Sequence, residues 1–113
     1  MDARELLRAE RAEVERTVAA LVRELDSAAE AAAGADDEHD PDGSTTAFER
    51  AQTAALLARA REQLAALDRA EQRLAAGTYG QCQRCGAPIA PERLQALPAT
   101  AHCRPCAERS RRH

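Results

Sequence analysis

Apolar residues recur at alternating spacings of three and four in two long stretches of the chain. Both stretches are rich in alanine, leucine, glutamate and arginine and contain no glycine or proline. In the first, residues 2–33, the stripe consists of Leu7, Val14, Val18, Leu21, Leu25, Ala28 and Ala32. In the second, residues 46–76, it consists of Leu57, Ala60, Leu64, Leu67 and Leu74. Such spacing is typical of a coiled-coil seam, so the pattern predicts two long helices.

A few positions depart from the two stripes. Arg11 interrupts the first stripe, and Glu71 is the charged member of the second. Phe48 and Leu56 lie beside the second stripe, where we expect them to widen it.

Capping residues and glycines predict where the helices begin and end. Asp2 and the glutamate three residues later resemble a cap at the start of the first helix, and Gly34 ends it. Thr46 and the glutamate three residues later form a capping box, which predicts that the second helix starts near Thr46. Gly77 ends the second helix.

The join between the helices is acidic and cannot form a core. Residues 34–45 read GADDEHDPDGST, with two glycines, a proline and five acids, so we expect a hairpin tip. The similar helix lengths and this join favour an intramolecular antiparallel hairpin over a dimeric coiled coil, and we expect a monomer. The hairpin with this tip is predicted over 1–76, which leaves residues 77–113 as a separate C-terminal part of the chain.

Composition limits the size of the core. The chain has 113 residues, and its hydrophobic fraction of 44% is largely alanine, with aromatics at only 2%. This composition fits a thin interface between helices, stabilised by an additional cross-link, better than a thick hydrophobic core. No apolar run approaches the length of a membrane span, and the charged N-terminus lacks a signal peptide, so we expect a cytoplasmic protein without a membrane partner.

Four cysteines near the C-terminal end form the pattern C-x2-C-x17-C-x2-C. They are Cys82, Cys85, Cys103 and Cys106. Two such pairs can complete a tetrahedron of sulfurs around one zinc ion, and four protein ligands leave no position open for catalysis. We therefore expect one structural zinc ion. A thiol redox pair, an iron site, or a site in which His102 replaces a cysteine are the alternatives.

The segment between the cysteine pairs also predicts structure. Pro91 suits the first turn of a short helix over 92–96, which would place Leu94 and Leu97 over the metal site. A last helix starts near Pro105 and carries an arginine-rich tail. Together these features predict an all-α fold: a long antiparallel helical hairpin, a small four-cysteine finger and a short terminal helix.

The order of these features resembles the DksA/TraR family of zinc-finger transcription regulators. A helical hairpin precedes G-T-Y-G-x-C-x-x-C-G at 77–86, I-A-P-E-R-L-x-A-x-P at 89–98, and a final C-x-x-C. The finger carries the specific part of the resemblance, whereas the hairpin matches in shape and position. The four cysteines match the zinc ligands of the family.

The resemblance implies a partner and a mechanism. Members of the family bind RNA polymerase rather than promoter DNA, and their coiled-coil tip enters the secondary channel, often together with the nucleotide ppGpp. The family's tip motif is Asp-x-x-Asp-x-Ala, and the nearest match here is Asp37, Asp40 and Asp42. Asp42 replaces the family's alanine, which leaves the direction of regulation open.

Two other classes of function compete with a polymerase-binding regulator. Arg84, Arg93 and Arg104 near the metal site, with the arginine tail, would suit a DNA-binding zinc ribbon, although a net charge of -3 opposes it. The hairpin could also serve as a coiled-coil adaptor. The sequence contains no nucleophile–base set and no phosphate-binding loop, so we do not expect an enzyme.

Overall fold

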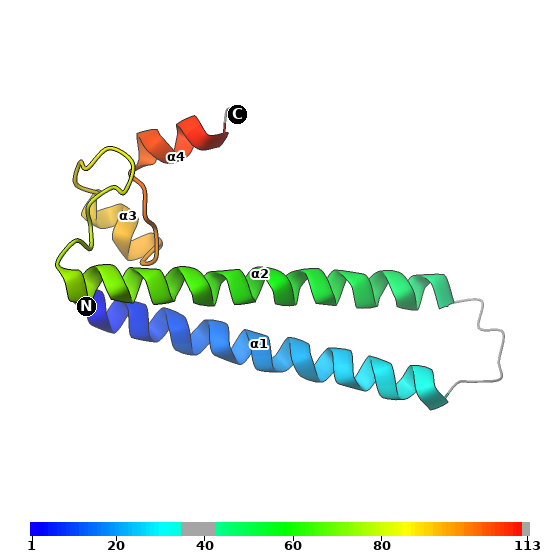
Figure 1. The fold of residues 1–113 in the computed structure, drawn as a ribbon. Helices are drawn as coiled ribbons and strands as arrows, with labels where there is room; N and C mark the ends of the chain where they lie inside the picture. Colours follow the sequence, from blue (N-terminus) through cyan, green and yellow to red (C-terminus); the bar gives the residue numbers. More distant parts are fainter. Residues whose placement is uncertain (35–42, 112–113) are drawn as a thin grey trace. The chain divides into compact units, whose positions relative to one another are not determined.

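The computed structural model describes residues 1–34 and 43–111. These ranges form four helices, namely α1 (Ala3–Gly34), α2 (Gly43–Ala76), α3 (Pro91–Ala96) and α4 (Arg104–Arg111) (Figure 1). In the same ranges, β structure is limited to one isolated antiparallel bridge between Gln81 and Pro88. The all-α fold class is therefore confirmed. None of the helices described is both long and apolar enough to cross a membrane.

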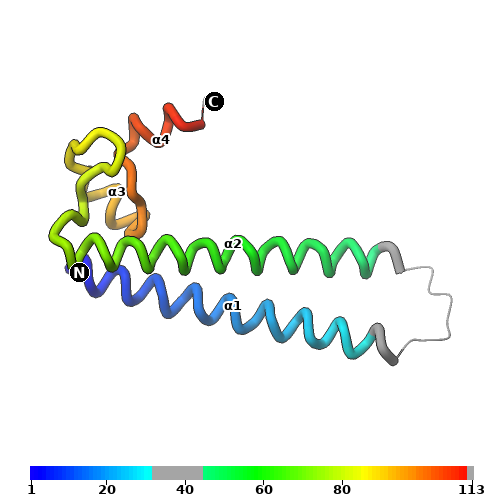
Figure 2. The backbone as a smooth tube through the Cα atoms, viewed as in Figure 1, coloured from blue at the N-terminus to red at the C-terminus, as the bar shows by residue number. Residues whose placement is uncertain are grey.

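The chain divides into two compact units, and each of the two long helices contributes residues to both. Figure 2 traces the backbone of α1 and α2 as two continuous helices. The first unit comprises Met1–Ala12 and Leu64–His113, and the second comprises Glu13–Gln63. In the first unit, the side chain of Arg11 on α1 reaches Glu71 on α2. In the second unit, Arg50 on α2 donates to the carbonyl of Ala28 on α1 at 3.5 Å. Later residues of α1 thus pair with earlier residues of α2, as in an antiparallel hairpin.

Most of the predicted helix ends are confirmed. The N–H of Glu5 donates to Oδ1 of Asp2 at 2.9 Å, which caps α1, and α1 ends at Gly34. Gly77, with φ +79°, follows the last residue of α2. The predicted start of α2 near Thr46 is wrong, because α2 begins at Gly43. A hydroxyl residue followed by glutamate three positions later also fits within a helix, so this spacing alone does not fix the boundary.

The seam of each unit is thin, as the composition predicts. The first unit buries Leu7, Leu67 and Ala70, and the second buries Val14, Leu57 and Ala60. On α2 the seam passes through Ala70 instead of Glu71, which lies exposed at its edge. Phe48 and Leu56 are 69% and 44% exposed, so the expectation that they widen the seam is wrong. The opposing helix stripe is too narrow to cover a second row of side chains.

Candidate metal centre

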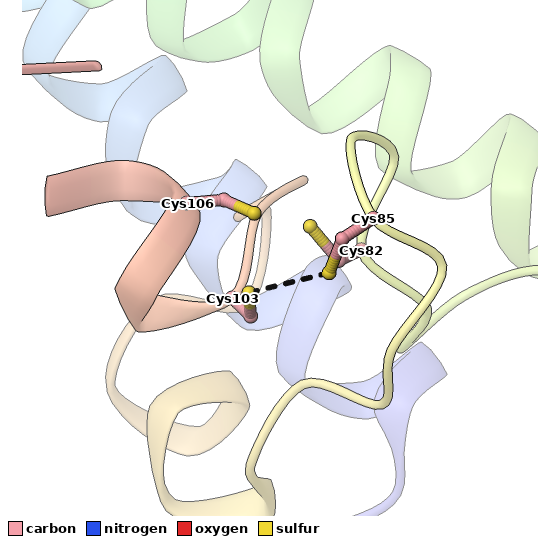
Figure 3. A group of neighbouring side chains, drawn as sticks. All are labelled: Cys82, Cys85, Cys103 and Cys106. Carbon is pink, nitrogen blue, oxygen red and sulfur yellow. Dashed lines mark hydrogen bonds between the residues drawn. The ribbon is translucent and has the colours of Figure 1, made fainter. Parts of the chain in front are cut away.

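The sulfur atoms of Cys82, Cys85, Cys103 and Cys106 converge on one point (Figure 3). All four lie within 4.8 Å of one another, and the Sγ atoms of Cys85 and Cys103 are 3.7 Å apart. A zinc tetrahedron with Zn–S bonds of about 2.3 Å has sulfur–sulfur edges of about 3.8 Å. The cluster therefore fits one zinc ion. His102, the alternative ligand, is not part of this group.

A tight turn presents the first pair of sulfurs. The N–H of Cys82 donates to the carbonyl of Ala87 at 2.8 Å, and the N–H of Gly86 donates back to the carbonyl of Cys82 at 2.8 Å. Gly86 has φ +78°, the left-handed region that a side chain would disfavour, while no atom blocks the space where a Cβ would lie. The glycine is therefore required by the backbone conformation of the turn.

The start of α4 presents the second pair. Cys103 immediately precedes α4 and Cys106 lies in its first turn, where the N–H of Ala107 donates to the carbonyl of Cys103 at 3.0 Å. A backbone hydrogen bond of 2.8 Å from Gln83 to the carbonyl of Ala101 joins the two cysteine-bearing segments. Both pairs thus owe their positions to backbone hydrogen bonds.

Apolar side chains cover one side of the cluster. Ile89 is 4% exposed and packs with three of the cysteines, and Leu94 of α3 packs against the same group. The helix predicted over 92–96 is present as α3 with Pro91 in its first turn. Leu97 was expected to cover the site as well, but it is 51% exposed. Leu97 comes directly after the last residue of α3, and its φ of -133° is not helical. Its side chain is therefore not aligned with the inner face of α3, and the next residue, Pro98, is buried instead.

Hydrogen bonds also fix the loop that leads to Cys103. Every backbone carbonyl from residue 98 to residue 102 accepts a hydrogen bond from another part of the finger or from α2. The hydroxyl of Tyr79 donates to the carbonyl of residue 98 (2.8 Å), and Nη2 of Arg73 donates to the carbonyls of residues 99 (3.3 Å) and 100 (3.4 Å). The N–H of Gln83 donates to the carbonyl of residue 101 (2.8 Å), and Nε of Arg93 donates to that of residue 102 (3.0 Å). The last turn of α2 is therefore tied directly to the chain that carries the second cysteine pair. Sequence reasoning did not identify this role for Arg73.

The thiols of the cluster differ in their affinity for protons. Hydrogen bonds from backbone N–H groups, first that of Cys103, lower the pKa of Cys82 to about 5. Hydrogen bonding to neighbouring sulfurs, first that of Cys103, and burial raise the pKa of Cys106 to about 12. Four thiolates this close repel one another, and a divalent cation removes that repulsion. The donor set therefore suits a thiophilic metal such as zinc.

The geometry agrees with a match in sequence. Residues 77–112 match the family described as "Prokaryotic dksA/traR C4-type zinc finger". Over these residues the finger is of the DksA/TraR C4 type. Zinc is accordingly the cofactor of this site, with one ion held by the DksA/TraR finger.

Two further comparisons extend the relationship. An uncharacterized protein of Aquifex aeolicus is 48% identical to this chain over 42 residues. The matched residues make up 37% of this chain and 29% of the Aquifex protein, so the match spans less than a third of that protein's length. The structure of transcription factor DksA2 from Pseudomonas aeruginosa is similar with a TM-score of 0.80 and 29% identity. That similarity covers 97% of this chain and 81% of DksA2. The likeness to DksA2 thus includes the long helices as well as the finger.

The arginines around the DksA/TraR finger are largely engaged within it. Arg84 donates to the hydroxyl of Ser110 at 3.0 Å, and Arg104 pairs with Glu108 at 3.1 Å. Arg93 is held by the carbonyl of His102. The predicted tip residues Asp37, Asp40 and Asp42 lie outside the residues that the structure describes.

Proposed function

We propose that this protein is a zinc-containing bacterial transcription regulator that binds RNA polymerase. In this proposal the acidic segment between α1 and α2 enters the secondary channel of the polymerase, and Asp37, Asp40 and Asp42 approach its active site. Residues 1–76 serve as the hairpin that carries the tip, and residues 77–113 serve as the finger. The proposed binding to polymerase does not require a nucleotide effector such as ppGpp.

The likeness to transcription factor DksA2 carries the proposal, because it extends over 97% of the chain with a TM-score of 0.80. A match to the finger alone would be compatible with many zinc proteins. Here a finger of the DksA/TraR family follows two long antiparallel helices, and the join between the helices is acidic. The family and the fold support a transcription regulator, and binding to the polymerase is the finer inference.

In this proposal zinc acts structurally. Cys82, Cys85, Cys103 and Cys106 would use all four positions of a tetrahedral ion, so no position is left for water or substrate. The ion would hold the turn at 82–85 to the start of α4. Because the loop at 98–102 also binds Arg73, the same ion would fix the finger to the last turn of α2.

The proposal is tested by co-purification with RNA polymerase and by the lifetime of promoter open complexes. The wild-type chain is expected to be retained by immobilised polymerase at modest salt and to change that lifetime. Replacing Asp37, Asp40 and Asp42 with Asn should leave folding and zinc content intact but reduce the change in lifetime.

A matched control removes three acidic charges elsewhere. Glu13, Glu15 and Glu62 are exposed, and their replacement with Gln changes the net charge by the same amount. This control variant is expected to act on open complexes as the wild type does. Absence of polymerase binding by the wild-type chain would refute the proposal, and equal effects of the two triple variants would remove the role of the tip.

A further inference from the structure

A groove lies between the first turns of α1 and the last turns of α2, within the first compact unit. It has a volume of about 430 Å³. Its lining residues are Arg4, Leu7, Arg8, Arg11, Glu71, Leu74 and Ala75. Three guanidinium groups thus border a floor made of leucine and alanine side chains, and one carboxylate lies among them. The volume falls in the range of pockets that take small molecules.

The three arginines are not equivalent. Arg11 pairs with Asp68 and Glu71 across the seam, so its charge is already neutralised. By contrast, no acidic side chain in the described part of the chain lies within ion-pairing distance of Arg4 or Arg8. Glu5 is adjacent to Arg4 and three residues before Arg8, yet it forms no ion pair with either, and Asp2 is used as the helix cap.

The positions of Arg4 and Arg8 are electrostatically unfavourable for the isolated helix. They are four residues apart on α1, so their like charges face each other on one side of the helix. Both also lie near the N-terminal end of α1, where the helix dipole disfavours cations. Glu5, three residues before Arg8, offsets part of this repulsion. Because neither arginine has an ion-pair partner among the described residues, both guanidinium groups remain available to an anion.

We propose that this groove binds a phosphorylated small molecule. The phosphate would lie between Arg4 and Arg8, whose guanidinium groups can each donate two parallel hydrogen bonds to its oxygens. An apolar group attached to the phosphate would lie on Leu7 and Leu74. Arg11 holds α1 to α2 and serves to keep the groove in shape. This site is separate from the zinc cluster and from the acidic tip, and it does not depend on binding to polymerase.

The test is a titration of the full-length zinc-loaded protein with phenyl phosphate and with methyl phosphate, followed by ³¹P NMR at low ionic strength. Phenyl phosphate is expected to bind more tightly than methyl phosphate, because only its ring can cover the apolar floor. The double variant Arg4→Gln/Arg8→Gln should weaken phenyl phosphate binding by at least about tenfold, since each lost arginine removes a charge-assisted hydrogen bond.

A control double variant, Arg16→Gln/Arg61→Gln, removes the same charge from two exposed positions outside the groove. It is expected to bind phenyl phosphate as the wild type does. Circular dichroism and zinc content would verify that both double variants are folded. The proposal is overturned if the wild type does not bind, if both double variants lose affinity equally, or if Arg4→Gln/Arg8→Gln binds unchanged. Equal affinity for the two phosphates would overturn the role of the apolar floor.

Discussion

The Nε atom of Arg11 lies 3.0 Å from Oε1 of Glu71, so the two charged residues that interrupt the apolar stripes of α1 and α2 contact each other. A second nitrogen of Arg11 reaches Asp68. The pairing aligns the start of α1 with the end of α2, next to the groove that Arg4 and Arg8 border. The stripes alone left the pairing of the two helices open, and this ion pair favours a single register.

We predict that Arg11→Gln lowers the free energy of unfolding by about 0.5–1 kcal/mol, the range for a partly exposed ion pair screened by solvent. The loss should shrink as salt is raised. Urea unfolding of Arg11→Gln, Glu71→Gln and the double variant would give the coupling energy between the two side chains. Arg16→Gln is the control on the same helix. A coupling energy of zero would show that the contact contributes nothing to stability.

The seam yields a matched pair of predictions on α2. Leu67 is 1% exposed and Leu56 is 44% exposed. Leu67→Ala should cost about 2–5 kcal/mol, because it removes buried surface and leaves a cavity. Leu56→Ala should stay within about 1 kcal/mol. Thermal or urea unfolding measures both, and similar losses for the two variants would contradict the burial described for them.

The finger and the helices were largely predictable because their signals are local. Cysteine spacing predicted which sulfurs converge, and apolar spacing predicted two long helices. The start of α2 was placed three residues late, because the spacing of Thr46 and Glu49 also fits within a helix. The burial of Ala70 in place of Glu71 depends on the rotation of α2 against its neighbour, which no single helix encodes.

The loop before Cys103 could not be predicted for a related reason. Arg73 and Tyr79 act on carbonyls that are 19 to 27 residues away in sequence. Backbone carbonyls carry no sequence signal, so only the folded chain reveals these hydrogen bonds. The same holds for the groove, whose lining comes from the first turns of α1 and the last turns of α2, which are about 60 residues apart in sequence.

Tyr79 provides a direct spectroscopic test, since it is the one tyrosine and the chain has no tryptophan. Burial raises the pKa of its phenol above the ordinary value of 10.0. Because the folded state favours the neutral phenol, this contribution to stability is complete below pH 10 and is lost as the pH rises through the folded-state pKa. An absorbance titration near 295 nm should show a pKa above 10 in the folded protein and a normal value in urea. A normal value in the folded protein would contradict the burial.

The hydrogen bond from Tyr79 to the carbonyl of Pro98 leads to a separate prediction. Tyr79→Phe should lower the free energy of unfolding of the finger by about 0.5–1.5 kcal/mol, because it leaves a part-buried carbonyl without its donor. Unfolding followed by circular dichroism in the presence of zinc would measure this loss. Unchanged stability would mean that water replaces the hydroxyl without cost.

Loss of one sulfur should affect the finger far more than the long helices. Cys85→Ser is expected to release zinc and to unfold residues 77–111, because metal binding supplies much of the folding energy of such a small segment. Most of the helical circular dichroism should remain, since α1 and α2 span 32 and 34 residues. Tyr79 should then titrate near its ordinary pKa. Retention of zinc at full stoichiometry would contradict the assignment of Cys85 as a ligand.

The central claim is that four sulfurs bind one zinc ion and thereby order the C-terminal part of the chain. Zinc X-ray absorption on freshly purified, reduced protein, combined with elemental analysis, tests it most directly. We predict one zinc per chain with four sulfur neighbours at about 2.3 Å. Protein without zinc, or zinc coordinated by fewer than four sulfurs, would contradict the account.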